Sequence, residues 1–409
     1  MDSPESRPLA SAPWLFERQG VALIALLMAI AATFAVLDLT FLAGCMLLVA
    51  LVARGWARVC LARVLYTRRP STERAFCGDE LHLESVLVNP RPLPLPWLEV
   101  WDQIPLTLDP EGLKERSYSR PDTVWVQRGL AVWPYQRLRW RRRLTCRKRG
   151  AYRLGEKRLR SGDPFGFFER ERILHDEIEV LVYPRVVPVR RLGLPMHHPS
   201  VDVVSPRSIV TDPTRTAAVR DYRPDDPQRL IHWPTTARRS ALHVRVLEPA
   251  TSLHVSLVFD ARGFAFGIYR GELLESMLSA LASLAVYLQA QGAPVSFHTN
   301  TQPPLAIPPG ASVAHLQSML EALARLDARG GTPLVPWLLE TLPRGNTLVL
   351  GASDMTPQLY ETVSTLQAAD YTVVLLLAIA QDRPRPQPVP GAVLITPGCD
   401  LAAVLEGRA

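Results

Sequence analysis

The first hydrophobic pattern along the chain is a long apolar stretch. From Gly20 to Ala53 nearly every residue is apolar, and the interruption falls at Asp38 and Thr40. Each half has about 15 to 18 residues, and at a rise of ~1.5 Å per residue such a helix spans most of a bilayer core. One continuous helix would hold Asp38 near the membrane centre, where a carboxylate is strongly disfavoured. Residues 20–54 therefore predict a transmembrane hairpin of two helices, with Asp38 in the turn.

After the hairpin, apolar and polar residues alternate with a period of two. The stretches "DELHLESVLVNP" and "RLRWRRRLTCRK" alternate apolar and polar residues, as half-buried strands do. "EIEVLVYPRVVPV" is rich in β-branched residues, and Gly, Pro and Asp separate these short runs. Residues 70–190 therefore predict an all-β, sandwich-like domain.

From Leu253 the pattern changes again. "LHVSLVFD", "APVSFHTN" and "NTLVLGASD" are apolar almost throughout, and they alternate with stretches of helical spacing such as "YRGELLESMLSALASLAVYLQAQG". This alternation indicates a mostly parallel sheet covered by helices on both faces, so residues 249–409 predict an α/β domain. Ligands of such folds bind at the carboxyl ends of the strands, which here are Asp260, Asn300 and Ser353-Asp354.

Charges beside the hairpin predict its orientation, because cytoplasmic loops retain Arg and Lys. Arginines lie on both outer sides of the hairpin and are absent from the Asp38 turn; they are Arg7, Arg18, Arg54, Arg58, Arg63, Arg68 and Arg69. Five scattered cysteines without a C-x-x-C pair also suit a reducing compartment. We therefore expect a two-pass protein of the bacterial inner (cytoplasmic) membrane, with residues 1–19 and the soluble domains in the cytoplasm.

The net charge of +7 changes little in this picture. Among 46 basic residues only Lys114, Lys148 and Lys157 are lysines, which is typical of a GC-rich genome rather than of a nucleic-acid partner. Residues 137–160 hold twelve basic residues and one acid, Glu156. No aromatic platform or base-reading motif accompanies them, so we expect no nucleic acid. A solvated edge strand and a contact with membrane lipid headgroups both remain open.

The segment "RDYRPDDPQRLIHWPTTARRSALHV", residues 220–244, predicts neither a helix nor a strand. Its His and Asp residues suffice for acid-base chemistry, and Arg220, Arg229 and Arg238 could bind an anion. No nucleophile motif or Gly-rich phosphate loop accompanies them. Alternating Arg and Asp near a domain junction favour a buried ionic network that fastens the two domains, with Asp226 paired to Arg229 and Trp233 as an apolar anchor. A surface for a protein partner and a catalytic centre are the alternatives.

The same segment carries a resemblance to a known family. Together with "RGAYRLG", "SGDPFGFF" and "VYPRV", the stretch "VRDYRPDDPQRLIHWPTTARRSALHVRVLE" resembles the bacterial domain-of-unknown-function family 58, membrane proteins with a von Willebrand factor A-like carboxy-terminal domain. This resemblance implies a Rossmann-type α/β domain over 249–409 and a motif segment over 191–248. The implied motif positions are Arg220, Tyr222, Asp226, Arg229, Trp233, Ala237, Arg238 and Glu248. Asp225 and Pro234 depart from the Gly and Lys common in that family.

The resemblance also allows a test for a metal. A von Willebrand A domain holds Mg²⁺ with an Asp-x-Ser-x-Ser loop, a Thr and a further Asp, and Asp260, Thr332 and Asp354 resemble three of these positions. Both Ser ligands are missing, and Arg262 enters the first loop. Mg²⁺ needs near-octahedral oxygen ligation. We therefore expect no bound metal and no cofactor, and an ion pair of Arg262 with Asp354 or Asp260.

For the function, the resemblance implies a non-enzymatic, membrane-anchored interaction or scaffold protein. Proteins of this family are often encoded beside MoxR-type AAA ATPases, which implies such an ATPase as partner in protein maturation or cell-envelope assembly. The alternative is a hydrolase or anion-binding enzyme that uses the Arg, His and Asp residues of 220–245. A pocket converging on Asp226, Arg229 and His232 would favour the enzyme, whereas side chains paired with one another would favour the interaction protein.

Overall fold

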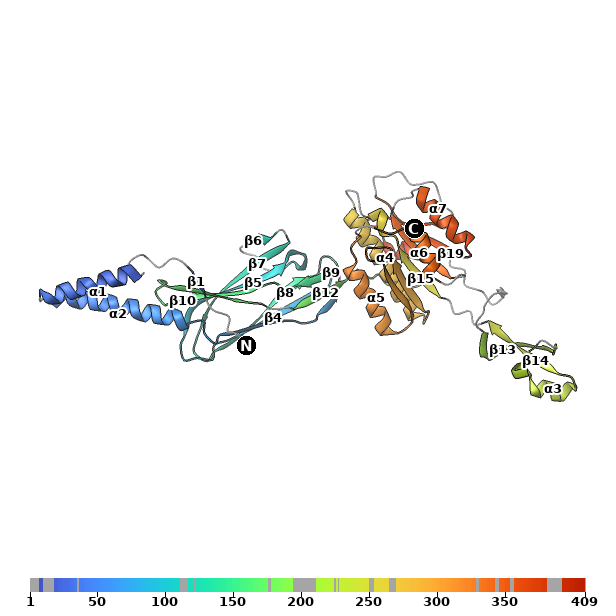
Figure 1. The fold of residues 1–409 in the computed structure, drawn as a ribbon, viewed down its shortest axis with the longest axis horizontal. Helices are drawn as coiled ribbons and strands as arrows, with labels where there is room; N and C mark the ends of the chain where they lie inside the picture. Colours follow the sequence, from blue (N-terminus) through green and yellow to red (C-terminus); the bar gives the residue numbers. More distant parts are fainter. Residues whose placement is uncertain are drawn as a thin grey trace. The chain divides into compact units, whose positions relative to one another are not determined.

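The computed structural model describes residues 7–9, 18–34, 37–110, 117–120, 122–175, 178–193, 211–223, 226, 228–249, 254–264, 270–328, 331–342, 346–353, 357–380 and 392–408 (Figure 1). The chain divides into two units. One comprises Met1–Arg185 with Ala324–Leu326, and the other comprises Val186–Leu323 with Asp327–Ala409.

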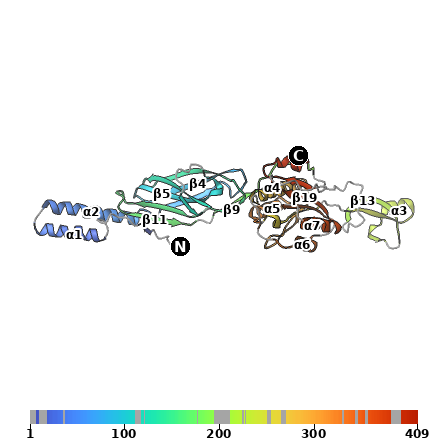
Figure 2. The same cartoon turned by 90° about the horizontal axis from the view of Figure 1, so that it is seen from above.

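The first unit begins with two antiparallel helices that lie side by side, α1 (Arg18–Thr33) and α2 (Leu37–Val59) (Figures 1 and 2). By length and composition α2 is apolar enough to cross a membrane, and α1 contains the shorter apolar stretch Val21–Ile30. The predicted hairpin is thus present, and α2 continues to Val59 rather than ending near residue 54. Asp38 lies in the first turn of α2, not in the connecting turn. A carboxylate is favourable there because helix N-termini carry partial positive charge.

The rest of the first unit is β-rich, as expected; after the helices its strands begin at Leu65 rather than near residue 70, and Arg7–Leu9, before the helices, adds a strand at one edge. Three sheets have the orders β1-β11-β10-β5-β7-β6, β2-β4-β8 and β3-β12-β9. The strands are β1 (Arg7–Leu9), β2 (Leu65–Pro70), β3 (Arg74–Phe76), β4 (Glu80–Val88), β5 (Leu95–Pro105), β6 (Ser117–Arg120), β7 (Thr123–Val132), β8 (Arg137–Thr145), β9 (Gly150–Arg153), β10 (Lys157–Gly162), β11 (Glu169–Leu174) and β12 (Glu179–Tyr183).

Two clusters of buried side chains, contributed by more than one sheet, form the core of this unit. Leu87 of β4 packs in one cluster with Val100 of β5, and Leu83 of β4 packs in the other with Ile104 of β5. The strict alternation of buried and accessible positions along β4 follows from the period of two in its sequence. This part of the chain therefore folds as packed β-sheets, as its sequence pattern predicts.

The arginine-rich strand β8 exposes Arg137, Arg139, Arg141 and Arg143 to solvent, whereas Arg142 is half-buried. It pairs antiparallel with β4, which brings its arginines beside glutamates of that strand. Arg139 pairs with Glu84, and Arg143 lies 3.5 Å from Glu80. These are exposed ion pairs, which stabilise a fold weakly. The pairing fits the solvated-face interpretation of this strand.

The second unit contains an α/β sheet of the order β17-β16-β15-β18-β19-β20. Neighbouring strands are parallel except β17, which lies antiparallel at one edge. The strands are β15 (Val255–Phe259), β16 (Val295–Thr299), β17 (Leu305–Gly310), β18 (Thr347–Ser353), β19 (Thr372–Ala378) and β20 (Ala392–Ile395); the helices are α4 (Arg270–Ala290), α5 (Val313–Arg325), α6 (Leu334–Thr341), α7 (Pro357–Ala368) and α8 (Leu401–Leu405).

Helices cover both faces of this sheet. Alternate residues of β18, such as Leu348 and Leu350, pack with α6 and α7, whereas Gly351 faces Met277 of α4 on the other side. The helix α4 is itself long and apolar enough to cross a membrane, but more than half of it is buried within the unit, as expected of a core helix. The apolar strands and the alternation with helices follow the sequence prediction.

Residues 211–249, called the motif hairpin below, form a separate two-stranded element of the second unit. Strands β13 (Thr211–Asp221) and β14 (His243–Pro249) pair antiparallel, and the 3-10 turn Gln228–Leu230 and helix α3 (Trp233–Arg239) lie between them (Figure 1). The expectation that residues 220–244 form neither helix nor strand is therefore wrong. The β14 strand pairs with β13, so the first strand of the large sheet is the separate β15.

Candidate functional site

The motif hairpin holds one strong ion pair at its surface. Arg220 donates from Nη1 to Oδ2 of Asp226 at 2.7 Å and from Nη2 to Oδ1 at 2.6 Å, and the Arg223 amide donates to the same carboxylate at 2.8 Å. These hydrogen bonds lower the pKa of Asp226 and raise that of Arg220. The sequence suggested Arg229 as the partner of Asp226, whereas the structure pairs Asp226 with Arg220. The side chains of Arg229 and Glu248 lie outside the described residues.

This ion pair is not buried, since 43% of the Arg220 side chain is accessible to solvent. The Arg220–Asp226 pair is therefore an exposed contact, and the buried network predicted at the domain junction stays a prediction. A two-stranded element with one short helix has too little apolar surface to bury a guanidinium. Whether the hairpin fastens the two domains is not decided by its own contacts, and the fastener stays a prediction.

The histidines of the motif hairpin are engaged in local contacts. The Nδ1 of His232 caps α3, where it accepts a hydrogen bond from the Thr235 amide at 3.3 Å. The buried ring of His243 has its Nδ1 2.7 Å from the Ala241 carbonyl and its Nε2 3.2 Å from Oδ1 of Asp221. Both rings therefore organise the turn between β13 and β14.

The remaining motif residues lie at the surface of the hairpin. Trp233 opens α3 with 66% of its area exposed, and Arg238 is exposed in the last turn. Tyr222 is half-buried, and its amide donates to the Leu242 carbonyl at 2.9 Å. Trp233 is thus mostly accessible to solvent among the described residues, and its role as an apolar anchor stays a prediction.

The carboxyl ends of β15 and β16 bring a second group of polar residues together. Arg262 donates from Nε to Oδ1 of Asp260 at 3.1 Å and from Nη2 to Oδ2 at 3.0 Å, and Asp260 is buried. The hydrogen bonds to Asp260 raise the pKa of Arg262. Of the two partners expected for Arg262, the structure confirms Asp260. Asp354 lies outside the described residues.

Asn300 links three loops at this edge of the sheet. Its Nδ2 donates to Oδ1 of Asp260 at 2.8 Å and to the Thr332 carbonyl at 3.0 Å, and its Oδ1 accepts from the Ala261 amide at 2.8 Å. A Cβ atom at Gly331 would collide with the aliphatic stem of Arg262, so glycine leaves room for that side chain. The edge is thus a rigid, hydrogen-bonded cluster.

The carboxylate at this edge already has a cationic partner. Both oxygens of Asp260 accept hydrogen bonds from the guanidinium of Arg262. Over the described ranges no group of three or more His, Cys, Asp or Glu residues is placed to hold a metal. The Thr332 hydroxyl is buried, and no hydrogen-bond partner for it lies among the described residues.

A buried polar cluster of the β-rich unit was missed by the sequence analysis. Arg68 lies 3.3 Å from Oδ1 of Asp102 and donates to the Gly155 carbonyl, while the Tyr66 hydroxyl donates to Oδ2 of Asp102 at 2.7 Å. Burial raises the pKa of Asp102, and the charge of Arg68 opposes that shift. The signal was available in "LYTRRP", because a period of two puts Tyr66 and Arg68 on the same face of one strand.

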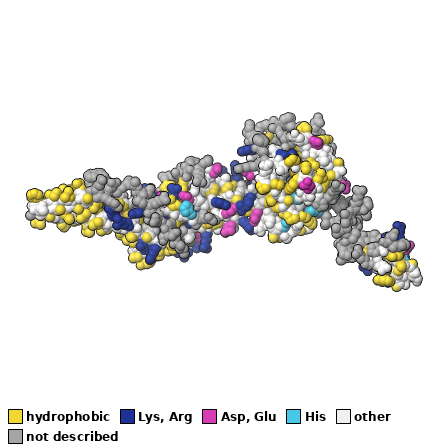
Figure 3. Space-filling model, viewed as in Figure 1, with side chains coloured by type: hydrophobic (Ala, Val, Ile, Leu, Met, Phe, Trp, Pro, Cys, Tyr) yellow, Lys and Arg dark blue, Asp and Glu magenta, His cyan; other side chains and the backbone are white. Residues whose placement is uncertain are grey.

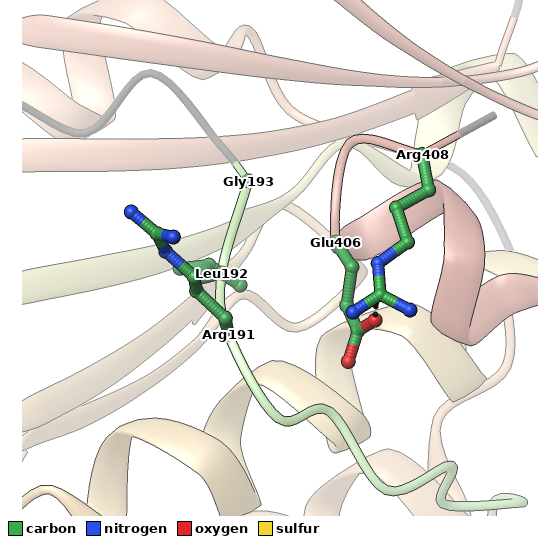
Figure 4. A pocket seen from close by; sticks show the side chains of 5 residues that line it. All are labelled: Arg191, Leu192, Gly193, Glu406 and Arg408. Atoms are coloured by element: carbon green, nitrogen blue, oxygen red, sulfur yellow. Dashed lines mark ion pairs between the residues drawn. The ribbon is translucent and has the colours of Figure 1, made fainter.

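A small polar pocket of about 360 Å³ lies between residues 191–193 and the end of α8 (Figure 4). Glu406 accepts from the Arg190 amide at 2.8 Å and pairs with Arg408 at 3.2 Å, and the Arg191 side chain points away from that pair. The contacts fasten the carboxy-terminal turn to residues 190–193. They engage the carboxylate of Glu406 in the described lining of the pocket.

Comparisons with known proteins bear on the family. The "Uncharacterized protein YeaD" of Bacillus subtilis (strain 168) is 24% identical over 320 residues, which cover 77% of this chain and 76% of that protein. The sequence model of the family described as "Protein of unknown function DUF58" matches residues 218–391.

Among solved structures, a β-glucosidase from Listeria innocua is 16% identical, with a TM-score of 0.16 over 29% of this chain and 16% of its own length. A GH20 exo β-N-acetylglucosaminidase from Vibrio harveyi, in complex with N-acetylglucosamine, is 8% identical, with a TM-score of 0.19 over 77% of this chain and 57% of its own. TM-scores of this size carry no argument about fold or function. Residues 218–391 are therefore similar to the DUF58 family, and the chain is similar over most of its length to the Bacillus relative.

Proposed function

We propose that the chain is a non-enzymatic, membrane-anchored interaction protein whose motif hairpin contacts a protein. The observation that carries this proposal is the exposed Trp233 on a hairpin in which Asp226, His232 and His243 make local contacts. An acid-base catalyst needs a group free to transfer a proton to substrate. Asp226 is held by Arg220, and His232 caps a helix. These pairings support the interaction protein over the hydrolase.

Exposed apolar side chains support a contact surface on this hairpin. Besides Trp233, Leu242 is 45% exposed and Val219 is 38% exposed. Tryptophan dominates the binding energy of many protein interfaces, because it buries a large area when a partner covers it. The partner surface is either another part of this chain, as in the fastener hypothesis, or a second protein.

The α/β sheet of the second unit is, in this proposal, a von Willebrand A-like domain in which Arg262 takes the place of the metal. Asp260 and Thr332 then keep the positions of two metal ligands, and Asp354 has the position of a third. The bidentate hydrogen bond of Arg262 to Asp260 supports this substitution. The domain would bind its partners without a metal.

The proposed location is the bacterial inner membrane, crossed by α1 and α2, with both soluble units in the cytoplasm. The apolar character of α2 and the arginines that follow it support this topology. A reporter that works only in the cytoplasm, fused after Ala409, should be active. Activity of a periplasmic reporter at the same position would contradict the topology.

A MoxR-type AAA ATPase is the partner that the family resemblance suggests, in protein maturation or envelope assembly. The test is capture of a purified MoxR-type ATPase from the same cell by the full chain in detergent, with and without ATP. Trp233→Ala should weaken capture about tenfold or more if the motif hairpin is the contact. Tyr360→Ala is the matched control, because Tyr360 is 62% exposed on α7 of the same unit. Equal capture by both variants would refute the role of the hairpin.

A further inference from the structure

The loop between β7 and β8 exposes two aromatic side chains to solvent. Trp133 is 68% exposed and Tyr135 is 70% exposed, and Pro134 separates them. Large aromatic side chains at a loop tip do not serve the core of their own unit. They indicate a surface that something of mixed polarity covers, since both rings are apolar with one polar atom.

This loop is tied to the end of α2 through the loop between β4 and β5. Asn89 donates to the Trp133 carbonyl at 3.2 Å, and the Tyr135 amide donates to the Arg91 carbonyl at 3.2 Å. The Arg91 side chain in turn donates to the Val59 carbonyl and, at 3.0 Å, to the Ala62 carbonyl. The aromatic loop therefore lies at the end of the β-rich unit from which α2 leaves.

The length of α2 indicates the depth in a bilayer at which this end of the β-rich unit lies. About 20 residues of helix cross the ~30 Å hydrocarbon layer. Counted from Leu37, the layer ends near Trp56, which puts Val59 and the residues after it at the depth of the lipid headgroups. Leu51 and Val52, which precede this level, are 56% and 51% exposed and continue the apolar outer surface of α2.

Basic side chains gather around the same level. Arg58 lies in the last turn of α2, and Arg137 follows the aromatic loop at the start of β8; both are exposed. Figure 3 shows basic side chains where the helical hairpin meets the β-rich unit. Guanidinium groups at this depth attract anionic headgroups, by about 1 kcal/mol for each residue near the surface.

We propose that residues 133–136 form a membrane-interface anchor, in which Trp133 and Tyr135 lie among the lipid headgroups beside Arg58 and Arg137. Tryptophan and tyrosine favour this depth because the ring is apolar and its N–H or O–H stays hydrated. The anchor fixes how the β-rich unit stands on the membrane. A headgroup layer is favoured over a protein partner because the loop continues the apolar surface of α2 at the level of its basic residues. The inference rests on the membrane anchoring proposed above.

The test uses the full chain in vesicles of phosphatidylcholine with about one third phosphatidylglycerol. Tryptophan fluorescence is quenched by lipids that carry a doxyl group at acyl carbon 5, which is shallow, or carbon 12, which is deep. The signal of Trp133 is the difference between the parent chain and Trp133→Phe. We expect the shallow quencher to reduce that difference signal at least twofold more than the deep one. Trp125→Phe is the control, because Trp125 is only 5% exposed and its signal should not respond.

Each other result overturns the inference. Quenching of Trp133 by aqueous iodide instead of shallow lipid would place the loop in water. Stronger quenching by the deep lipid would place it in the hydrocarbon. Protection from all three quenchers would indicate that protein covers the loop. Membrane anchoring itself is measured separately, by extraction of the vesicles with alkaline carbonate. If the parent chain is released, the proposed membrane anchoring is wrong. If it stays in the vesicles, the quenching results test only the position of the loop.

Discussion

Replacement of Arg68 by methionine should destabilise the β-rich unit strongly. The side chain is buried between the sheets, and its guanidinium lies 3.3 Å from Oδ1 of Asp102, which is only 4% exposed. Methionine fills a similar volume with no charge, so the substitution removes the cation that donates directly to the buried Asp102 carboxylate, while the more distant charges of Arg142 and Lys157 remain. The hydrogen bond from Tyr66 remains.

The magnitude follows from the cost of breaking a buried, hydrogen-bonded ion pair. Breaking a buried ion pair by removing one partner costs about 3–5 kcal/mol. In a unit of this size each kcal/mol lowers the melting temperature by about 2–4 °C, so Arg68→Met should melt roughly 6–20 °C below the parent. Burial already raises the pKa of Asp102, and the loss of Arg68 raises it further. Protonation then relieves the buried charge, so the deficit of the variant should shrink as the pH falls from 8 to 5.

The assay is calorimetric melting of the full chain in detergent at several pH values. Arg69→Met is the matched control, because Arg69 is the next residue of β2 and is exposed on the opposite face. The double variant Arg68→Met/Asp102→Asn should regain part of the lost stability, because it removes the carboxylate while an amide oxygen still accepts from Tyr66. If Arg68→Met melts within about 2 °C of Arg69→Met, or if the double variant is the less stable, the charge argument is wrong.

Three further predictions concern the second unit. Arg220→Ala or Asp226→Ala should leave the melting temperature near that of the parent, because the pair is exposed. A drop in melting temperature as large as that of Arg68→Met would instead support the buried network. Calorimetry of the full chain with Mg²⁺ or Mn²⁺ should detect no micromolar binding, and binding that disappears in Asp260→Ala would contradict this. Burial and, secondarily, His254 lower the pKa of His298 to about 4, so folding loses stability as the pH falls below 6.5, by about 2 kcal/mol at pH 5. Denaturant unfolding at pH 7 and 5 should show a smaller acid loss in His298→Leu, and an equal loss would refute it.

Hydrophobic periodicity predicted those parts of the fold in which a single burial pattern continues over many residues. The apolar run from Gly20 to Ala53 became α1 and α2, and the alternation of residues 80–88 became β4. The observed ends of the elements differ from the predicted ones because a helix continues as long as its hydrogen bonds and packing contacts support it. Thus α2 passes Arg54 and ends where Arg91 caps the Val59 carbonyl, which is a contact distant in sequence.

The strands and helix of the motif hairpin were not predicted from the sequence, for a different physical reason. Its strands are separated by more than twenty residues, and its cross-strand partners Asp221 and His243 are polar. Neither strand needs a continuous apolar face, because a two-stranded element buries little surface. The cap of α3 is also unusual, since His232 acts where Ser, Thr, Asp or Asn is common. The His and Asp residues of this segment suggested acid-base chemistry, whereas in the structure they stabilise the turn between the two strands.

At the carboxyl edge of the sheet the sequence predicted the ion pair but not the arrangement that maintains it. Arg262 is two residues from Asp260, so local spacing alone brings guanidinium and carboxylate within reach. Asn300 reaches Asp260 only because β15 and β16 are adjacent parallel strands that end at the same level. The Asn300 amide donates one hydrogen bond to the Asp260 carboxylate, which keeps that carboxylate in position for Arg262. It donates another to the Thr332 carbonyl. Removing Arg262 alone would therefore leave Asp260 oriented by Asn300, an ordered buried carboxylate without its cation. That makes Arg262 the residue on which the charge balance at Asp260 depends.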